Sequence, residues 1–285
     1  MDDAELVRAI EENAAELLLA MGTAGGGRQR PGGGQEPGGG AARREPGGGE
    51  SLAGDGVRWS IGGSPLDYHN AVVGCSVEDG AAADLVIAES LQELRDFGVP
   101  GCWHVGPSMR PLDLGERLLA AGFSYGGPEP GMALRLAELR EAEAAGLRVE
   151  RLTEVDGLTV WAQTLGRGFG EGVKEAEWVA SVYRRLGVAD PWRHYVGYLA
   201  DEPVATATVF LAAGVAGVYF VMTVPEARRR GIGAAITAAV LREARDSGLE
   251  YAVLGSSPAG HSVYAGLGFR ELCAVHLYER ALPEE

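Results

Sequence analysis

The chain has 285 residues, of which 46% are hydrophobic, and this length and composition predict a globular protein of about two domains. Acidic residues outnumber basic ones by 40 to 25, and the formal net charge of -15 argues against nucleic acid or an anionic membrane as the main partner. A solvated acidic surface explains such a charge, and a cationic substrate such as an amine is compatible with it.

Cysteine and histidine usage argues against a disulfide framework and a metal site. Cys75, Cys102 and Cys273 are far apart, and the five histidines are scattered without ligand spacing. The sequence has no apolar run of about 18 residues, and the N-terminus lacks the positively charged start of a secretory signal. We therefore expect a cytoplasmic protein with reduced thiols, no metal and no membrane contact.

Two segments of different character open the chain. Residues 1–21 carry apolar residues at three- and four-residue spacing, which predicts an amphipathic packing helix over residues 3–21. Residues 22–56 repeat Pro-Gly-Gly-Gly and contain almost no large apolar residue. This composition predicts a flexible segment that cannot offset its ordering entropy.

Residues 57–136 alternate strand and helix patterns, as expected of an α/β unit. The predicted elements, in order, are strands at 57–61 and 71–77, a helix at 82–97, a strand at 102–105, a helix at 113–121 and a strand at 132–136. A charged helical connector is predicted for residues 137–145.

Residues 146–285 form the second predicted unit. A strand at 147–152 is followed by one helix that ends near residue 165 and by a second helix at 176–186. Strands at 194–200, 203–212 and 216–224 are joined by tight turns and should form an antiparallel meander. A helix opens at Gly231 and ends near Ser247-Gly248; a strand at 251–254, a short helix to Gly266 and a strand at 269–278 follow.

The stretch Val218–Gly233 has the pattern of a phosphate site. A β-branched and aromatic strand ends at Pro225, three arginines follow, and Gly231-Ile232-Gly233 opens a helix. Unpaired N–H groups and the helix dipole favour an anion at such a point, and glycines allow close approach to the backbone. Neither a G-x-x-x-x-G-K-[ST] loop nor a G-x-G-x-x-G dinucleotide motif is present; the motif is R-x-x-G-x-G, Arg228–Gly233.

A second motif lies about 30 residues downstream, where Ser257-Pro258 precedes Tyr264-Ala265-Gly266-Leu267-Gly268-Phe269. Together the two motifs resemble the GNAT superfamily of acyl-CoA-dependent N-acetyltransferases, over about residues 147–278. The resemblance implies a mixed, mostly antiparallel α/β sheet flanked by helices, and acetyl-CoA as cosubstrate.

The resemblance also assigns roles to single residues. It implies that the backbone of Met222 and Val224 pairs with the pantetheine arm, that Tyr264 protonates the departing CoA thiolate, and that Ser257 stands about where many members carry an asparagine. The pyrophosphate would be held by the turn residues Arg229, Arg230, Gly231, Ile232, Gly233 and Ala234. A phenol with a pKa near 10 is protonated at neutral pH and can serve as this acid.

The general base is left open by the sequence. Some family members carry a glutamate on the strand before the pyrophosphate turn, but residues 218–224 contain no carboxylate. Glu171, Glu175, Glu177 and His261 are candidates, and each can also be an ordinary surface residue.

A comparison within the chain suggests a tandem arrangement. Leu118-Leu119-Ala120-Ala121-Gly122-Phe123 resembles Tyr264–Phe269, with Leu118 in the place of the tyrosine, and no R-x-x-G-x-G precedes it. We therefore expect residues 57–136 to be a partial GNAT-like unit without cofactor chemistry, although a chance match of a common Gly-Phe pattern would look the same.

The sequence thus predicts an acetyl-CoA-dependent N-acetyltransferase that acts by direct attack of an amine through a tetrahedral intermediate. The acceptor is a small-molecule amine or a protein or peptide amine, in a cleft shaped by residues 166–173 and the first unit, and the protein is a monomer or homodimer. A catalytically silent acyl-CoA-binding sensor or scaffold is the alternative, and transfer of a longer acyl chain is another.

Overall fold

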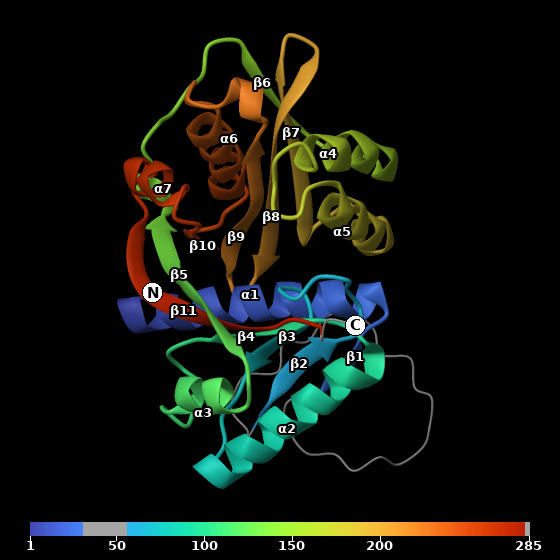
Figure 1. Ribbon diagram of the computed structural model, residues 1–285. Coiled ribbons are helices and arrows are strands. Elements are labelled where there is room, and N and C mark those ends of the chain that lie inside the picture. Colours follow the sequence, from blue (N-terminus) through green and yellow to red (C-terminus); the bar gives the residue numbers. More distant parts are fainter. Residues whose placement is uncertain (31–55, 283–285) are drawn as a thin grey trace.

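The computed structural model describes residues 1–30 and 56–282 (Figure 1). Most of the predicted flexible segment, 22–56, lies outside these residues; within them, Gly22–Gly25 end the first helix, and Arg28–Arg30 form a strand. No helix in the described ranges combines the length and the apolar character needed to cross a bilayer.

Apart from β1, which lies in the segment predicted to be flexible, the elements follow the order expected from the sequence, in two halves. The first half contains α1 (Asp3–Gly25), β1 (Arg28–Arg30), β2 (Arg58–Ile61), β3 (Ala71–Gly74), α2 (Gly80–Phe97), β4 (Gly101–Val105), α3 (Leu114–Ala120) and β5 (Ser124–Arg135). The second contains β6 (Leu147–Arg151), α4 (Leu158–Leu165), α5 (Val173–Leu186), β7 (Trp192–Leu199), β8 (Glu202–Ala212), β9 (Val215–Thr223), α6 (Ile232–Asp246), β10 (Tyr251–Gly255), α7 (His261–Leu267) and β11 (Arg270–Arg280).

The strands within residues 1–30 and 56–282 all join one 11-stranded sheet in the order β1-β2-β3-β4-β11-β5-β10-β9-β8-β7-β6. Only the β3–β4 and β9–β10 pairs are parallel, so the sheet is mostly antiparallel, as predicted. The meander β7–β8–β9 is present with the predicted antiparallel pairing.

The two halves repeat one topology. In each, three strands pair antiparallel (β1–β2–β3 and β7–β8–β9), a helix (α2 or α6) leads to a parallel strand (β4 or β10), and a short helix (α3 or α7) follows. The turns after the short helices carry the same hydrogen bond: the N–H of Phe123 donates to Leu118 O at 3.0 Å, and that of Phe269 donates to Tyr264 O at 3.1 Å. The internal resemblance read from the sequence therefore has a structural counterpart.

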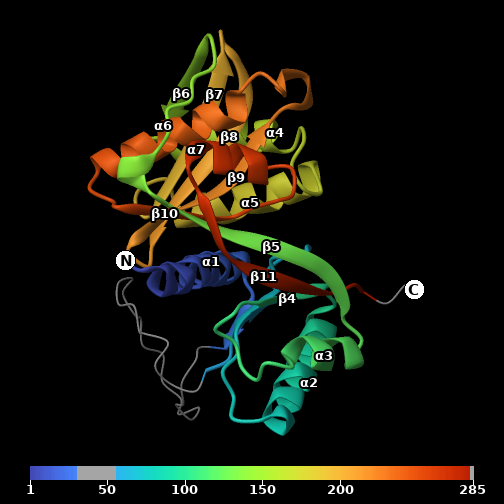
Figure 2. The ribbon, with the colours of Figure 1, turned by 90° about the vertical axis from the view of Figure 1, so that its left-hand side faces the viewer.

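The halves exchange their last strands. The strand that ends the first half, β5, pairs with β10 of the second, while β11 pairs with β4 of the first, and β5 and β11 pair with each other. These two long strands cross between the halves in Figures 1 and 2. Residues of the first half are thereby placed beside the parallel strands of the second.

Helix α1 lies between the rest of the first half and the second half (Figure 2). Its N-cap Asp2 accepts a hydrogen bond from the Glu5 N–H at 2.8 Å, and Glu5 bonds back to the Asp2 N–H, which forms a capping box. Near its middle, the buried Asn13 donates to Ala212 O at 3.0 Å and accepts from the Tyr219 hydroxyl at 2.7 Å. The helix is fastened to the second half by polar as well as apolar contacts.

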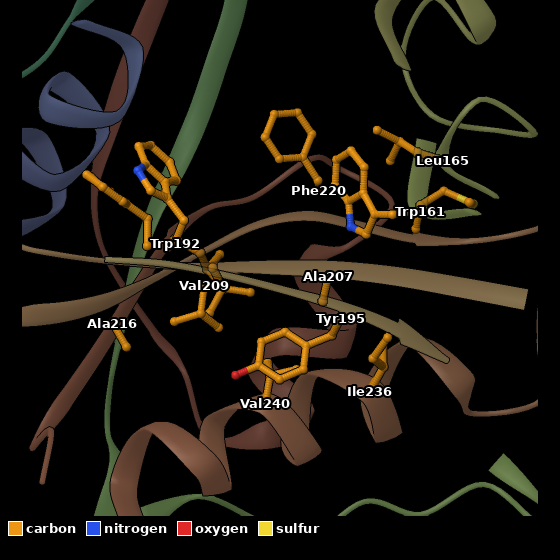
Figure 3. Close-up of a cluster of buried hydrophobic side chains, with 14 of the residues drawn as sticks. Trp161, Leu165, Trp192, Tyr195, Ala207, Val209, Ala216, Phe220, Ile236 and Val240 are labelled. Carbon is orange, nitrogen blue, oxygen red and sulfur yellow. The ribbon is translucent and has the colours of Figure 1, made fainter. Parts of the chain in front are cut away.

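The main core lies on both faces of the second half of the sheet, as Figure 3 shows. On one face, Trp161 of α4 makes edge contacts with the rings of Tyr183 and Phe220, at centroid distances of 5.7 and 5.8 Å. On the other, Ile236 and Val240 of α6 are fully buried. A separate cluster beneath α2 and α3 forms the core of the first half.

Two predictions of local structure are wrong. The connector 137–145 is not helical beyond a short 3-10 turn at Leu136–Glu138, because Leu136 and Leu139 are buried and the N–H groups of Leu136 and Arg140 bond to Glu250 O and Leu267 O. The strand predicted at 132–136 begins much earlier, at Ser124, because pairing with β11 holds residues through a Gly-Gly-Pro-Glu-Pro-Gly sequence that is a poor strand former.

Candidate functional site

The turn between β9 and α6 is an exposed row of backbone donors. Arg229 and Gly231 both adopt left-handed conformations, with φ of 63° and 75°. From Arg229 to Ala234, no backbone N–H has an acceptor among residues 1–30 and 56–282. A row of free N–H groups at the positive end of a 15-residue helix is a fitting site for a phosphate or pyrophosphate.

The three arginines of this turn differ in their contacts. The guanidinium of Arg228 donates to Thr223 O at 2.9 Å and to Gly168 O at 3.0 Å, so it fixes the turn to the end of β9 and to the loop before α5. Arg229 and Arg230 are exposed and form no ion pair with any residue the structure describes. Their charges are thus free to face an anion.

The parallel strands β9 and β10 separate after a short contact. They are paired only at Ala216 with Ala252 and at Gly217 with Val253, although β9 continues to Thr223 and β10 to Gly255. Phe220, with φ of 51°, and a shift in register against β8 mark a bulge at the point of separation. The facing edge of β9 is left open toward β10, a place where an extended ligand arm can pair like a strand.

The residues of β9 whose backbone faces the open edge are not Met222 and Val224, as predicted, but their neighbours one position earlier in the chain. The N–H of Val224 donates to Val204 O at 2.9 Å, and its carbonyl accepts from Ala227 N at 2.9 Å, so the backbone of Val224 is already fully bonded. Because backbone groups alternate in direction along a strand, Met222 faces β8 as well. The open edge belongs instead to Val221 and to the N–H of Thr223, whose carbonyl accepts from Arg228, and the prediction of Met222 and Val224 is corrected accordingly.

Ser257 and Tyr264 both follow β10 in the chain, Ser257 in the loop after the strand and Tyr264 on α7. Tyr264 lies on α7 against Phe269, with ring centroids 5.9 Å apart, and burial raises the pKa of its phenol to about 12. Its hydroxyl has no hydrogen-bond partner among the described residues. The hydroxyl of Ser257 accepts the Gly260 N–H at 3.2 Å, so in this structure it caps the turn before α7.

A pocket of about 340 Å³ opens beside the separation of the two strands. Its walls come from α1, from the loop 66–69 of the first half, from the loop 169–171 before α5, from β9 at Val218–Phe220, and from Gly255 at the end of β10. It therefore lies between the two halves and uses the predicted acceptor loop 166–173.

Glu129 of β5 stands at the inner wall of this pocket. Its carboxylate accepts hydrogen bonds from the Tyr68 hydroxyl at 3.3 and 3.4 Å, and it lies against Gly255: a Cβ built on Gly255 would be 2.7 Å from the carboxyl carbon. Burial raises the pKa of this carboxyl. Sequence reasoning missed Glu129, because its strand was not recognised; the one signal was a carboxylate between two prolines in an otherwise uncharged stretch.

The four candidate bases named from the sequence fare differently. Glu175 is buried in the pocket wall, where its carboxylate bonds to His69 Nε2 at 3.3 Å and to the Glu171 N–H at 3.0 Å. Despite the cost of burial, the His69 contact leaves the pKa of Glu175 below its ordinary value. Glu171 lines the pocket, whereas Glu177 is exposed and does not line it. His261 also lies outside the pocket lining, and its Nε2 is 3.0 Å from a carboxylate oxygen of Glu271.

The first half lacks the corresponding cofactor features. At the N-terminus of α2, which corresponds to α6, the Asp79 carboxylate accepts the Ala82 N–H at 2.9 Å, so a negative charge occupies the position that a phosphate would take. Leu118, in the position of Tyr264, is fully buried in the core. Within the described residues, no group of three or more histidine, cysteine or acidic side chains could hold a metal.

A comparison with protein-family models identifies part of the chain. Residues 130–264 match the model described as "Acetyltransferase (GNAT) domain". No curated protein matches the chain.

Solved structures share its fold over 79% to 95% of the chain. A GCN5-related N-acetyltransferase from Kribbella flavida has a TM-score of 0.67 at 18% identity, covering 95% of this chain and 96% of its own. A functionally unknown conserved protein from Staphylococcus epidermidis has a TM-score of 0.62 at 14% identity, covering 79% of this chain and 91% of its own. A tandem GNAT protein from the clavulanic acid biosynthesis pathway has a TM-score of 0.56 at 13% identity, covering 81% of this chain and 79% of its own.

Proposed function

Because the chain carries a GNAT acetyltransferase domain over residues 130–264, we propose that it transfers an acetyl group from acetyl-CoA to the nitrogen of an amine. The observation that carries this proposal is the row of free N–H groups from Arg229 to Ala234 beside the open edge of β9. A pyrophosphate and an extended amide-bearing arm need these two features side by side.

Each part of the site then has a task. The backbone of residues 229–234 and the side chains of Arg229 and Arg230 hold the pyrophosphate, with charge-assisted hydrogen bonds from the guanidinium groups. Val221 and Thr223 pair with the pantetheine arm, which brings the thioester to the separation of β9 and β10. Arg228 keeps the turn in position through its bonds to Thr223 and Gly168.

Tyr264 is proposed as the acid. The amine nitrogen would attack the thioester carbon to form a tetrahedral intermediate, and the carbon–sulfur bond would break as Tyr264 donates its proton to the thiolate. The proton that the nitrogen loses would restore Tyr264 through solvent. With its pKa raised to about 12, the phenol is fully protonated at neutral pH and available for this step. The unbonded hydroxyl of Tyr264 is consistent with a partner supplied by the cosubstrate.

Replacing Tyr264 by phenylalanine tests this assignment. Because the ring and its packing on Phe269 remain, we expect acetyl-CoA to raise the melting temperature of the variant as much as that of the wild type. Release of free thiol from acetyl-CoA in the presence of amines should fall by about 100-fold, the lower end of general acid catalysis. Unchanged thiol release would remove Tyr264 from this role.

The second candidate function is a binding module that holds acyl-CoA without turnover. The feature that favours it is the lack of any carboxylate on β9. If acetyl-CoA stabilises the protein while no amine causes thiol release, this second function is the correct one.

A further inference from the structure

The pocket between the halves has the charge and the walls of a site for a small organic cation. Of the residues the structure describes, four carboxylates line it (Asp67, Glu129, Glu171 and Glu175), and no lysine or arginine does. The same pocket is lined by the aromatic residues Tyr68, His69, Phe169, Tyr219 and Phe220. Aromatic faces and carboxylates together attract an ammonium group on an apolar body.

Glu129 has no cation of its own in the described structure. Its hydrogen bond comes from the neutral Tyr68, and the other titratable groups that feel its charge are Tyr219 of β9 and Cys102 of β4, whose pKa values are raised as well. A carboxylate in such surroundings is costly to keep charged without a partner. A bound ammonium ion offsets this cost.

His69 provides a second, independent observation. It is 3% exposed, and its ring lies between Tyr68 and Trp178, at centroid distances of 5.5 and 4.6 Å. Its Nε2 contacts Glu175, but its Nδ1 has no hydrogen-bond partner among the described residues. A buried unpaired nitrogen at a pocket wall indicates a ligand group or a water that bonds there.

The location of Glu129 connects this pocket to the chemistry. Its carboxylate touches Gly255, the last residue of β10, and β10 has separated from β9 by this point. If the pantetheine arm pairs with β9 as proposed above, its thioester end would reach this same separation, and a nitrogen bound at Glu129 would stand beside it.

We propose that the acceptor is a primary amine that enters the pocket as a cation, and that Glu129, supplied by the first half through the exchanged strand β5, takes the proton that frees its lone pair. This deepens and rests on the proposed acetyl transfer. The ammonium loses one proton to Glu129, the nitrogen forms the carbon–nitrogen bond, and the carbon–sulfur bond breaks. The thiolate receives the Tyr264 proton, and the second nitrogen proton restores Tyr264 through solvent. One proton per turnover passes from Glu129 to solvent.

The exchange of strands thereby gains a function. The first half lacks cofactor features of its own, yet under this proposal it contributes the base and the Tyr68 hydroxyl to the site of the second. A separate second half, residues 146–285, would lack both.

The test compares Glu129→Gln with the wild type and with Glu177→Gln, a matched control on the exposed side of α5. Thiol release from acetyl-CoA is measured with phenethylamine, tryptamine and hexylamine over a range of pH. We expect kcat/KM of the wild type to fall at low pH, as Glu129 becomes protonated, at a pH above the ordinary pKa of a glutamate. Glu129→Gln should lose about 100-fold in kcat/KM together with this acid limb, while keeping the stabilisation by acetyl-CoA.

A binding arm separates this inference from the proposed function. The rise in melting temperature caused by each amine is compared with that caused by the matching alcohol. A larger rise in melting temperature with the amine than with the alcohol, lost in Glu129→Gln but kept in Glu177→Gln, supports the cation site. If this result is found but no thiol is released, the cation site stands and only the proposed acetyl transfer is refuted. If no amine exceeds its alcohol, or if Glu129→Gln retains wild-type kcat/KM and its acid limb, the inference is overturned.

Discussion

Gly255→Ala tests the placement of Glu129 without touching its chemistry. A Cβ at this position would lie 2.7 Å from Glu129 Cδ and 2.8 and 3.0 Å from the carboxylate oxygens. Unbonded carbons rest at about 3.5–4.0 Å, so the carboxylate must move by about 1 Å. It can do so, because it is the end of a flexible side chain and the backbone of Gly255 has no left-handed φ.

The expected result is a stable protein with a misplaced base. Alanine restricts the unfolded chain relative to glycine, a stabilisation of about 0.4–1 kcal/mol that offsets the strain. A displacement of about 1 Å at a reacting group lowers turnover by about 100-fold. Thiol release is measured with a saturating amine, and the melting temperature is recorded with and without acetyl-CoA.

Gly266→Ala is the matched control, since a Cβ there meets no atom within 4 Å. It should keep wild-type turnover. If Gly255→Ala is stable, binds acetyl-CoA and turns over at the wild-type rate, then Glu129 is not next to the reacting nitrogen.

Two further predictions concern stability. Trp161→Ala should lower the free energy of unfolding by about 3–5 kcal/mol, because the ring is fully buried among Tyr183, His194 and Phe220. Trp161→Phe should lower it less, since this change also removes an indole N–H that has no partner in the described structure. Equal losses of unfolding free energy for the two variants in urea titrations would contradict this packing. Burial lowers the pKa of His194 to about 3 and that of His104 to about 4, below the ordinary value of 6.5. Between these values the unfolded chain binds more protons than the folded one, so the free energy of unfolding should fall as the pH drops below about 6.5. Replacing His194 by glutamine should reduce this slope, and a urea midpoint that does not change between pH 7 and pH 5 would contradict it.

The sequence predicts best what is locally encoded. The strand, turn and helix at 218–233 and the Tyr264 element carry their own turn and cap residues, and the structure has them at the expected places. The repeat of Leu118–Phe123 and Tyr264–Phe269 was visible in the same way, and its hydrogen bonds agree.

What the sequence could not predict depends on long-range pairing. The bulge at Phe220 determines which residues of β9 face outward, and this places Val221 and Thr223 at the open edge in place of Met222 and Val224. The exchange of β5 and β11 is decided by contacts between residues more than 100 positions apart. Glu129 was missed for that reason: its flanking prolines disfavour a strand, and only the partner strand β11 reveals its position.

The most direct test of the proposed activity follows the acetyl group itself. The full chain is incubated with acetyl-CoA that carries an isotope-labelled acetyl group and with a mixture of primary amines, and the products are separated by mass. The proposed activity requires label on the amine nitrogen in equal amount to the free thiol released, and neither without protein. Stabilisation of the protein by acetyl-CoA with no label on any amine would contradict it and leave a module that binds the cosubstrate without using it.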